Sequence, residues 1–212
     1  MQTTIFNLII MDESGSMQDI KPQIVSGFNE TVQTIKLAKE QYPEQNHLVS
    51  LVFFNGSGTR TIHDCALVES IKELKDTDYK PNYDTPLYDA MGFSLAGLKT
   101  KVKSEDKVLV TILTDGLENA SKVFDQQTIK KMVEELRSKG WVFAFMGANQ
   151  DVEKVAFSLS IQNYDSFIAS QQGAVLAMKK MKESRSRVYD KINQGVKNLD
   201  EGFFDEEKKV KK

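Results

Sequence analysis

The feature that most constrains the fold is a short apolar run near the N-terminus that ends in a cluster of oxygen-bearing side chains. Residues 5–11 are apolar except for Asn7, and the run is closed by Gly and Ser. A run of this kind, too short for a helix, is typical of a strand buried on both faces of a parallel sheet. Asp12, Ser14 and Ser16 follow at alternate positions. The sequence therefore places a carboxylate and two hydroxyls at the carboxyl end of a buried strand.

Two interpretations of this cluster are open from the residues alone. Oxygen-only ligands suit a hard divalent cation such as Mg²⁺, which prefers octahedral geometry and gives up its waters reluctantly. Asp and Ser are also favoured in turns and at helix N-caps, where they need no ligand. A motif this short does not decide between a metal site and a plain turn.

The rest of the chain alternates dense apolar runs with amphipathic stretches. We expect further strands at 48–54, 59–64, 107–114, 141–146 and 164–169. We expect helices at 19–41, 87–102, 126–139, 152–159 and 171–197. This alternation predicts an α/β fold, a Rossmann-like, doubly wound, mostly parallel sheet with helices on both faces. One strand, 59–64, is expected to be antiparallel and at the edge.

The chain is expected to divide into three parts. Residues 1–170 form one domain, 171–197 form a C-terminal helix packed on it, and 198–212 form a charged, disordered tail. We interpret Met178 and Met181 in that helix as packing residues. Its basic residues are spread over several faces, which predicts a solvated surface rather than a phosphate-binding strip. They are Lys179, Lys180, Lys182, Arg185 and Arg187.

Two more polar residues fall at positions that the fold would bring to the same place. In doubly wound sheets, ligands bind outside the carboxyl ends of strands, where the strand order reverses. The strand at 107–114 ends directly in Asp115, which would meet Asp12 if the two strands are neighbours. Thr85 precedes Pro86 at a predicted helix start, so its hydroxyl is placed either to cap that helix or to extend outward from it.

Composition excludes several classes of function. A formal net charge of −2 leaves no basic face for nucleic acid. One cysteine, Cys65, cannot form an intrachain disulfide, and His47 and His63, expected as loop or strand residues, are too few for a typical zinc site. No signal peptide and no membrane-length apolar run is present, which predicts a cytoplasmic location. No glycine-rich nucleotide-binding motif follows a strand.

Three separated segments together resemble the von Willebrand factor A (vWA) domain family over roughly residues 3–170. The metal-ion-dependent adhesion site of that family combines a DxSxS turn, a distant threonine and a more distant aspartate. All five positions are filled here, by Asp12, Ser14, Ser16, Thr85 and Asp115. Residues 85–90 and 113–116 also look like family segments. Asp84 is a departure, because many relatives carry a small residue there.

The resemblance implies a Mg²⁺ site, with Mn²⁺ or Ca²⁺ as alternatives. By this analogy Ser14, Ser16 and, in one state, Thr85 contact the metal directly, while Asp12 and Asp115 hold it through water. With no carboxylate bound directly, an Asp or Glu of a partner protein would become the preferred additional ligand. The chain is thus expected to be a metal-dependent protein-interaction domain, not an enzyme, similar to stand-alone bacterial or phage vWA proteins.

Two alternative functions stay open. Asp12 beside Mg²⁺ could act as the nucleophile of a phosphatase or phosphotransferase. Against this, Ser14 stands where a second acid would be expected, and no general acid or base is evident nearby. By analogy with some bacterial relatives, the chain could instead be an accessory subunit of an AAA-type ATPase or belong to a tellurite-resistance system. The partner is unknown, and neither nucleic acid nor a membrane is expected as one.

Overall fold

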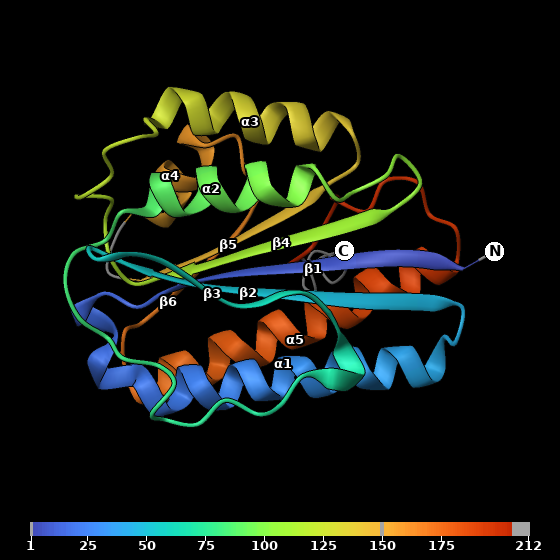
Figure 1. Cartoon of the computed structure of the whole chain (residues 1–212), viewed down its shortest axis with the longest axis horizontal. Coiled ribbons are helices and arrows are strands. Elements are labelled where there is room, and N and C mark those ends of the chain that lie inside the picture. The colour runs from blue at the N-terminus through green and yellow to red at the C-terminus, as the bar shows by residue number, and fades with distance from the viewer. Residues whose placement is uncertain (1, 149–150, 205–212) are drawn as a thin grey trace, which may run out of the picture.

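A single mixed sheet forms the centre of the molecule. The computed structural model describes residues 2–148 and 151–204. Its strands are β1 (Thr3–Asp12), β2 (Gln45–Asn55), β3 (Gly58–Leu67), β4 (Lys107–Thr114), β5 (Val142–Ala148) and β6 (Asn163–Phe167). They lie in the order β3-β2-β1-β4-β5-β6 (Figure 1), and only β3, at one edge, runs antiparallel to its neighbour. The predicted fold class is confirmed.

Helices cover both faces of this sheet. The helices are α1 (Lys21–Gln41), α2 (Leu87–Lys99), α3 (Gln126–Ser138), α4 (Val152–Ser158) and α5 (Gln171–Asn193). Figure 1 shows α1 and α5 on one face and α2, α3 and α4 on the other. Two short 3₁₀ helices, η1 (Gly15–Ile20) and η2 (Val68–Ser70), follow β1 and β3. Among the described residues, no helix is both long and apolar enough to cross a bilayer.

The strand β1 explains why the N-terminal run is so apolar. Ile5, Ile9 and Met11 belong to the core under α1 and α5, whereas Phe6, Leu8 and Ile10 belong to the core under α2 and α3. Side chains alternate between the two faces of a strand, so a central strand covered on both faces needs apolar residues at consecutive positions.

Helices α1 and α5 pack closely against each other. A Cβ added at Gly27 of α1 would lie 2.8 Å from Cβ and 2.4 Å from Cε of Met178 on α5, so only glycine lets the two helices approach this far. Met181, about one turn further along α5, is buried, and Met178 is partly buried against the same core. The predicted packing role of the two methionines is confirmed.

The prediction that Arg185 lies on a solvated surface was wrong. Its side chain is fully buried, 0% exposed, and points back into the sheet. Its guanidinium donates to Asn7 Oδ1 at 2.9 Å and to Thr111 Oγ1 at 3.0 Å. Tyr189, also on α5, donates to the same Asn7 oxygen at 2.5 Å. Polar side chains on β1 and β4 thus accept hydrogen bonds from a buried cation that α5 supplies.

His47 of β2 is buried beside this cluster, with its ring 4.7 Å from the ring of Tyr189. Burial, followed by the charges of Lys39 and Arg185, lowers the pKa of His47 to about 4. The folded state therefore holds the ring neutral at pH values where the unfolded chain, with a pKa near 6.5, is protonated.

We expect His47→Gln to make the protein less sensitive to acid. The contribution of His47 to stability is complete above pH 6.5 and declines as the pH falls toward 4, by about 1.4 kcal/mol per pH unit and roughly 3 kcal/mol in all. Urea unfolding at several pH values between 7 and 4 measures this loss in wild type and variant. His63→Gln, which changes a half-buried ring on β3, is the control. A His47→Gln protein that loses as much stability as wild type would contradict the prediction.

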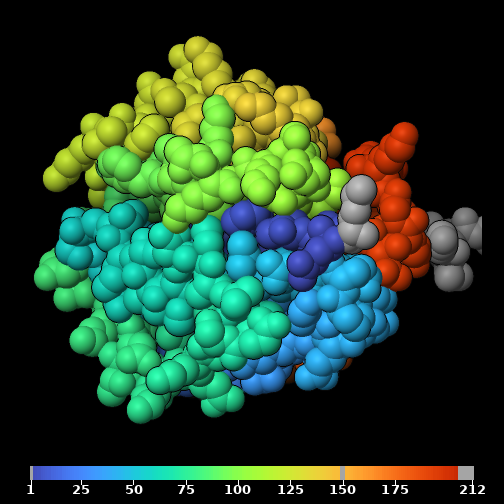
Figure 2. Space-filling view, turned by 45° about the vertical axis from the view of Figure 1, so that its right-hand side comes forward, coloured from blue at the N-terminus to red at the C-terminus, as the bar shows by residue number. Residues whose placement is uncertain are grey.

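Several element boundaries differ from those predicted. Residues 19 and 20 belong to η1 rather than to the long helix predicted from residue 19, and β3 continues to Leu67 instead of ending at residue 64. The tail prediction was wrong for residues 198–204, because Leu199 and Phe203 are buried and Asp200 pairs with Arg137 at 2.6 Å. Figure 2 shows this segment, in red, packed beside the body of the molecule. Residues 205–212 of the predicted tail lie outside the described residues.

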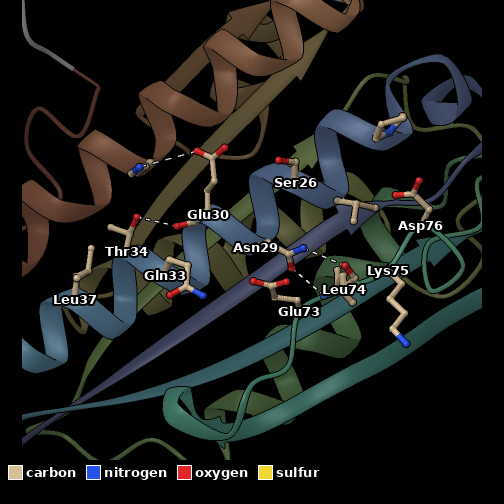
Figure 3. A pocket seen from close by; sticks show the side chains of 13 residues that line it. Ser26, Asn29, Glu30, Gln33, Thr34, Leu37, Glu73, Leu74, Lys75 and Asp76 are labelled. Atoms are coloured by element: carbon tan, nitrogen blue, oxygen red, sulfur yellow. Dashed lines mark hydrogen bonds and ion pairs between the residues drawn. The ribbon is translucent and has the colours of Figure 1, made fainter.

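The extended segment 71–83 crosses α1 on its way from η2 to α2. A groove of about 480 Å³ lies between α1 and this segment. Figure 3 shows side chains that line it, among them Asn29 and Leu74. The Asn29 amide donates to Leu74 O at 3.0 Å and accepts from Leu74 N at 2.8 Å, so it replaces a backbone partner. Lys36 donates to Ile71 O at 3.1 Å. These bonds fix a segment that leads directly into the loop before Thr85.

Candidate metal centre

The predicted site residues start from two neighbouring strand ends. β1 and β4 pair in parallel with Met11 opposite Leu113, so Asp12 and Asp115 leave the sheet at the same edge. After β1 the chain turns to α1 on one face, and after β4 it leads to α3 on the other. The strand order reverses between these two strand ends, which makes this the switch point at which doubly wound sheets bind ligands.

Four of the five predicted residues are joined by a chain of hydrogen bonds. Ser14 N donates to Asp12 Oδ1 at 2.7 Å, which folds the DxSxS turn back on itself. The hydroxyls of Ser14 and Ser16 lie 3.2 Å apart, and Ser16 Oγ donates to Asp115 Oδ1 at 2.5 Å. Ser16 therefore links residues almost a hundred positions apart in the chain.

Thr85 approaches the same point from a third loop. It is buried, and a Cβ added at Gly116 would lie 2.8 Å from Thr85 Oγ1, which places this hydroxyl beside the backbone that follows Asp115. The N-cap of α2 is Pro86 and receives no side-chain hydrogen bond. Of the two roles left open for Thr85, the helix cap is therefore wrong, and its hydroxyl lies beside Gly116 instead.

The carboxyl group of Asp12 is held in an unfavourable environment for a negative charge. It is fully buried, and burial raises its pKa to about 6 despite the hydrogen bonds from Thr114 and Ser14. Thr114 Oγ1 donates to Asp12 Oδ2 at 2.5 Å. Burial also raises the pKa of Asp115, while the bond from Ser16 opposes this. Both acids would be stabilised by a nearby cation.

The donor set fits a hard divalent cation. Within the described ranges, neither Asp12 nor Asp115 forms an ion pair, so two buried carboxylates share a small volume without a counter-charge. The described residues also contain no cluster of three or more His, Cys, Asp or Glu side chains suited to a metal. A cation here would depend on hydroxyl oxygens in addition to two acids, which is the chemistry of Mg²⁺, Mn²⁺ or Ca²⁺ rather than Zn²⁺.

Glu13 holds the DxSxS turn in place, a role that the sequence did not reveal. Its buried carboxylate pairs with Arg60 of β3 at 2.7 Å and accepts from Lys80 N at 2.6 Å. Its carbonyl accepts from Asn82 N at 2.9 Å. The Tyr79 hydroxyl donates to the carbonyl of the preceding Asp12. The segment 79–83 thus binds to the turn along its length. Arg60 and Tyr79 are far from Glu13 in the sequence and lie near it only in the folded chain.

The loop after β4 is fixed to Thr85 in a similar way. Asn119 accepts from Thr85 N through Oδ1 at 2.8 Å, and its own N–H donates to Thr85 O at 3.2 Å. Glu118 accepts from the backbone of Tyr88 at 2.9 Å and of Ser121 at 2.7 Å. Asn119 therefore sets the distance between the Thr85 loop and the Asp115 loop. No short motif in the sequence marks it.

Comparison with known proteins gives a likeness in structure only. No protein-family model and no curated protein matches the chain in sequence. Among solved structures, the VWA domain of SpRpn10 matches 85% of this chain and 95% of its own, with a TM-score of 0.57 and 8% identity. The chain therefore has a vWA-like fold.

Other proteins with this vWA-like fold are larger or carry metal. A point mutant of the PilB minor pilin from Streptococcus sanguinis has a TM-score of 0.63 and 13% identity over 90% of this chain, but only 63% of the pilin is covered. The chain thus spans less than two thirds of that protein. Manganese-loaded TRAP from Plasmodium vivax matches 84% of this chain and 72% of its own, with a TM-score of 0.52 and 16% identity. In that protein the fold carries a divalent cation.

Proposed function

We propose that this chain is a metal-dependent protein-interaction domain and not an enzyme. In this proposal Ser14, Ser16 and Thr85 hold Mg²⁺ through their hydroxyls, with Asp12 and Asp115 in its outer shell. The observation that supports it most directly is the pair of buried carboxylates that lack a cationic partner among the described residues.

When bound, the cation offers a coordination position to an acidic side chain of a partner protein. The chain's own residues define that position, because Ser16 and Gly15 are exposed while Asp12 and Ser14 are buried beneath them. A partner carboxylate would therefore approach from the open side of the turn. Mn²⁺ and Ca²⁺ are alternatives with the same preference for oxygen.

The wider biological setting is part of the proposal. The resemblance in sequence suggests that the chain is a cytoplasmic, bacterial protein that works with an AAA-type ATPase. Pilus proteins are among the structures with the same fold. Their location is a property of those proteins and is not transferred to this chain.

We expect Ser14→Ala to weaken the binding of Mn²⁺ at least tenfold and to abolish Mg²⁺-dependent capture of a partner. Removing one ligand or its support typically lowers metal affinity 10- to 100-fold. Mn²⁺ binding is followed by electron paramagnetic resonance, and capture from cell extract is compared in Mg²⁺ and in EDTA. Ser26→Ala, at an exposed serine of α1, is the matched control. Capture that is unchanged by both EDTA and Ser14→Ala would contradict a metal-bridged interface.

A further inference from the structure

Two large apolar side chains stand exposed on the loops that border the candidate metal centre. Tyr83 is 61% exposed and Leu117 is 58% exposed. The Tyr83 carbonyl accepts from Gly15 N at 3.0 Å, between the two serines of the turn. Leu117 follows Gly116, which lies against Thr85. Each of the two loops beside the metal centre therefore carries an exposed apolar side chain that a bound ligand could contact.

Tyr83 is held in a conformation that its side chain does not favour. Its φ angle is +66°, in the left-handed region that non-glycine residues seldom adopt. The backbone is fixed on each side, since Asn82 N donates to Glu13 O at 2.9 Å and Gly15 N donates to Tyr83 O at 3.0 Å. Strained residues of this kind cluster at binding sites, and rigid exposed tyrosines are enriched among the residues that dominate interfaces.

The same border is negatively charged. Asp84 is exposed, and in the part of the chain that the structure describes it forms no ion pair. Glu118 is satisfied entirely by uncharged donors, the Ser121 hydroxyl and the backbone N–H groups of Tyr88, Ala120 and Ser121. Of the cations near the turn, Arg60 is already paired with Glu13, and Lys80 is exposed on the segment that leads to Tyr83. Asp84 directly precedes Thr85, and Glu118 adjoins Asn119, which accepts from Thr85 N, so each of the two loops carries one acid near Thr85.

From these contacts we infer that the partner presents one acidic residue flanked by an apolar and a basic side chain, rather than a run of acids. This inference rests on the proposed function, because the acidic residue is the one that the metal would bind. The apolar neighbour packs on Tyr83 and Leu117, and the basic neighbour faces Asp84 and Glu118. Additional acids beside the first would be repelled by the same two carboxylates.

Three capped tripeptides test this inference by NMR titration of the full-length, ¹⁵N-labelled protein in Mg²⁺. They are acetyl-Leu-Asp-Arg-amide, acetyl-Gly-Asp-Gly-amide and acetyl-Asp-Asp-Asp-amide. We expect the first to bind about tenfold more tightly than the second, and the third to bind more weakly than the second. All binding should disappear in EDTA.

Two variants identify the side chains responsible. Tyr83→Asn keeps a residue that tolerates the left-handed backbone and should lower the advantage of the leucine-containing peptide to about threefold or less. Asp84→Asn should improve binding of the triple-aspartate peptide. Equal affinity for all three peptides, or tightest binding of the triple-aspartate peptide, would overturn the inference and leave metal-bridged binding intact. If no peptide binds in Mg²⁺, the inference and the proposed function both fail.

Discussion

Asp12→Asn should make the metal-free protein more stable at pH 7 and lower its affinity for a divalent cation about 10- to 100-fold. In the folded protein the pKa of Asp12 is raised from 3.8 to about 6 by burial. Each pKa unit corresponds to about 1.4 kcal/mol, so the charged form costs the fold at most about 3 kcal/mol at neutral pH. Asparagine has nearly the same shape and carries no charge.

The hydrogen bonds around Asp12 allow asparagine to replace it. The asparagine oxygen can accept from Ser14 N, as Asp12 Oδ1 does at 2.7 Å. Its amide can donate to Thr114 Oγ1, because the Thr114 hydroxyl has a second acceptor, Gly116 O, at 3.1 Å. No buried polar atom is left without a partner, so the gain from removing the charge should not be cancelled.

The pH dependence separates this explanation from a general change in packing. A folded pKa above the unfolded value means that the carboxyl group imposes no penalty below about pH 3.8, and that the penalty is complete above about pH 6. The advantage of Asp12→Asn in EDTA should therefore shrink as the pH falls from 6 to 4. Urea unfolding at each pH measures it, and Asp19→Asn, at an exposed position of η1, is the control. A variant less stable than wild type at pH 7 would refute the prediction.

Much of the fold could be predicted because the apolar runs are dense and well separated. β4 and β5 follow from dense apolar runs, and α3 is capped by Asp125, whose side chain accepts from Thr128 N at 2.7 Å. Gly140, with φ at +85°, ends it as predicted. The segment 71–83 could not be predicted, because its partners Asn29 and Lys36 lie on a helix far away in the sequence.

The candidate metal centre could likewise be predicted only in part. Its five oxygen-bearing residues are at strand ends and a helix start, so their approach to one edge follows from the topology. The positions of the groups that hold these five residues in place do not follow from the topology. Glu13 and Asn119 occupy positions that any motif leaves free, and their roles depend on Arg60, Lys80 and Thr85 in other loops. Whether the five residues bind metal stays a prediction.

Arg185 shows why surface patterns mislead on a helix rich in basic residues. Lysines surround it in the sequence, and only Asn7 and Thr111, on two strands, distinguish it from them. Arg is seldom buried unless it is paired, and no carboxylate is among the groups that receive its hydrogen bonds in the described structure. The buried cation therefore relies on neutral oxygens, and Asn7 Oδ1 serves both Arg185 and Tyr189.

Asn7→Leu should lower the free energy of unfolding by about 3–5 kcal/mol, because it leaves a buried guanidinium without its main acceptor. Arg185→Met should change it by less than about 1.5 kcal/mol, since a buried charge is replaced by an apolar side chain and Asn7 keeps its bond from Tyr189. Urea unfolding at pH 7 measures both. Lys179→Met removes an exposed charge from the same helix and should change stability by less than about 0.5 kcal/mol.

The double variant decides whether the buried charge is the cause. If Asn7→Leu is harmful because Arg185 loses its acceptor, the loss should be smaller by at least about 2 kcal/mol, the coupling energy, when Arg185 is already methionine. Only the Tyr189 hydroxyl then lacks its acceptor, at a cost of about 1–3 kcal/mol. Simple additivity of the two changes would show instead that Asn7 acts through the shape of β1. In that case the neutral oxygens would not be what allows α5 to bring a cation into the core.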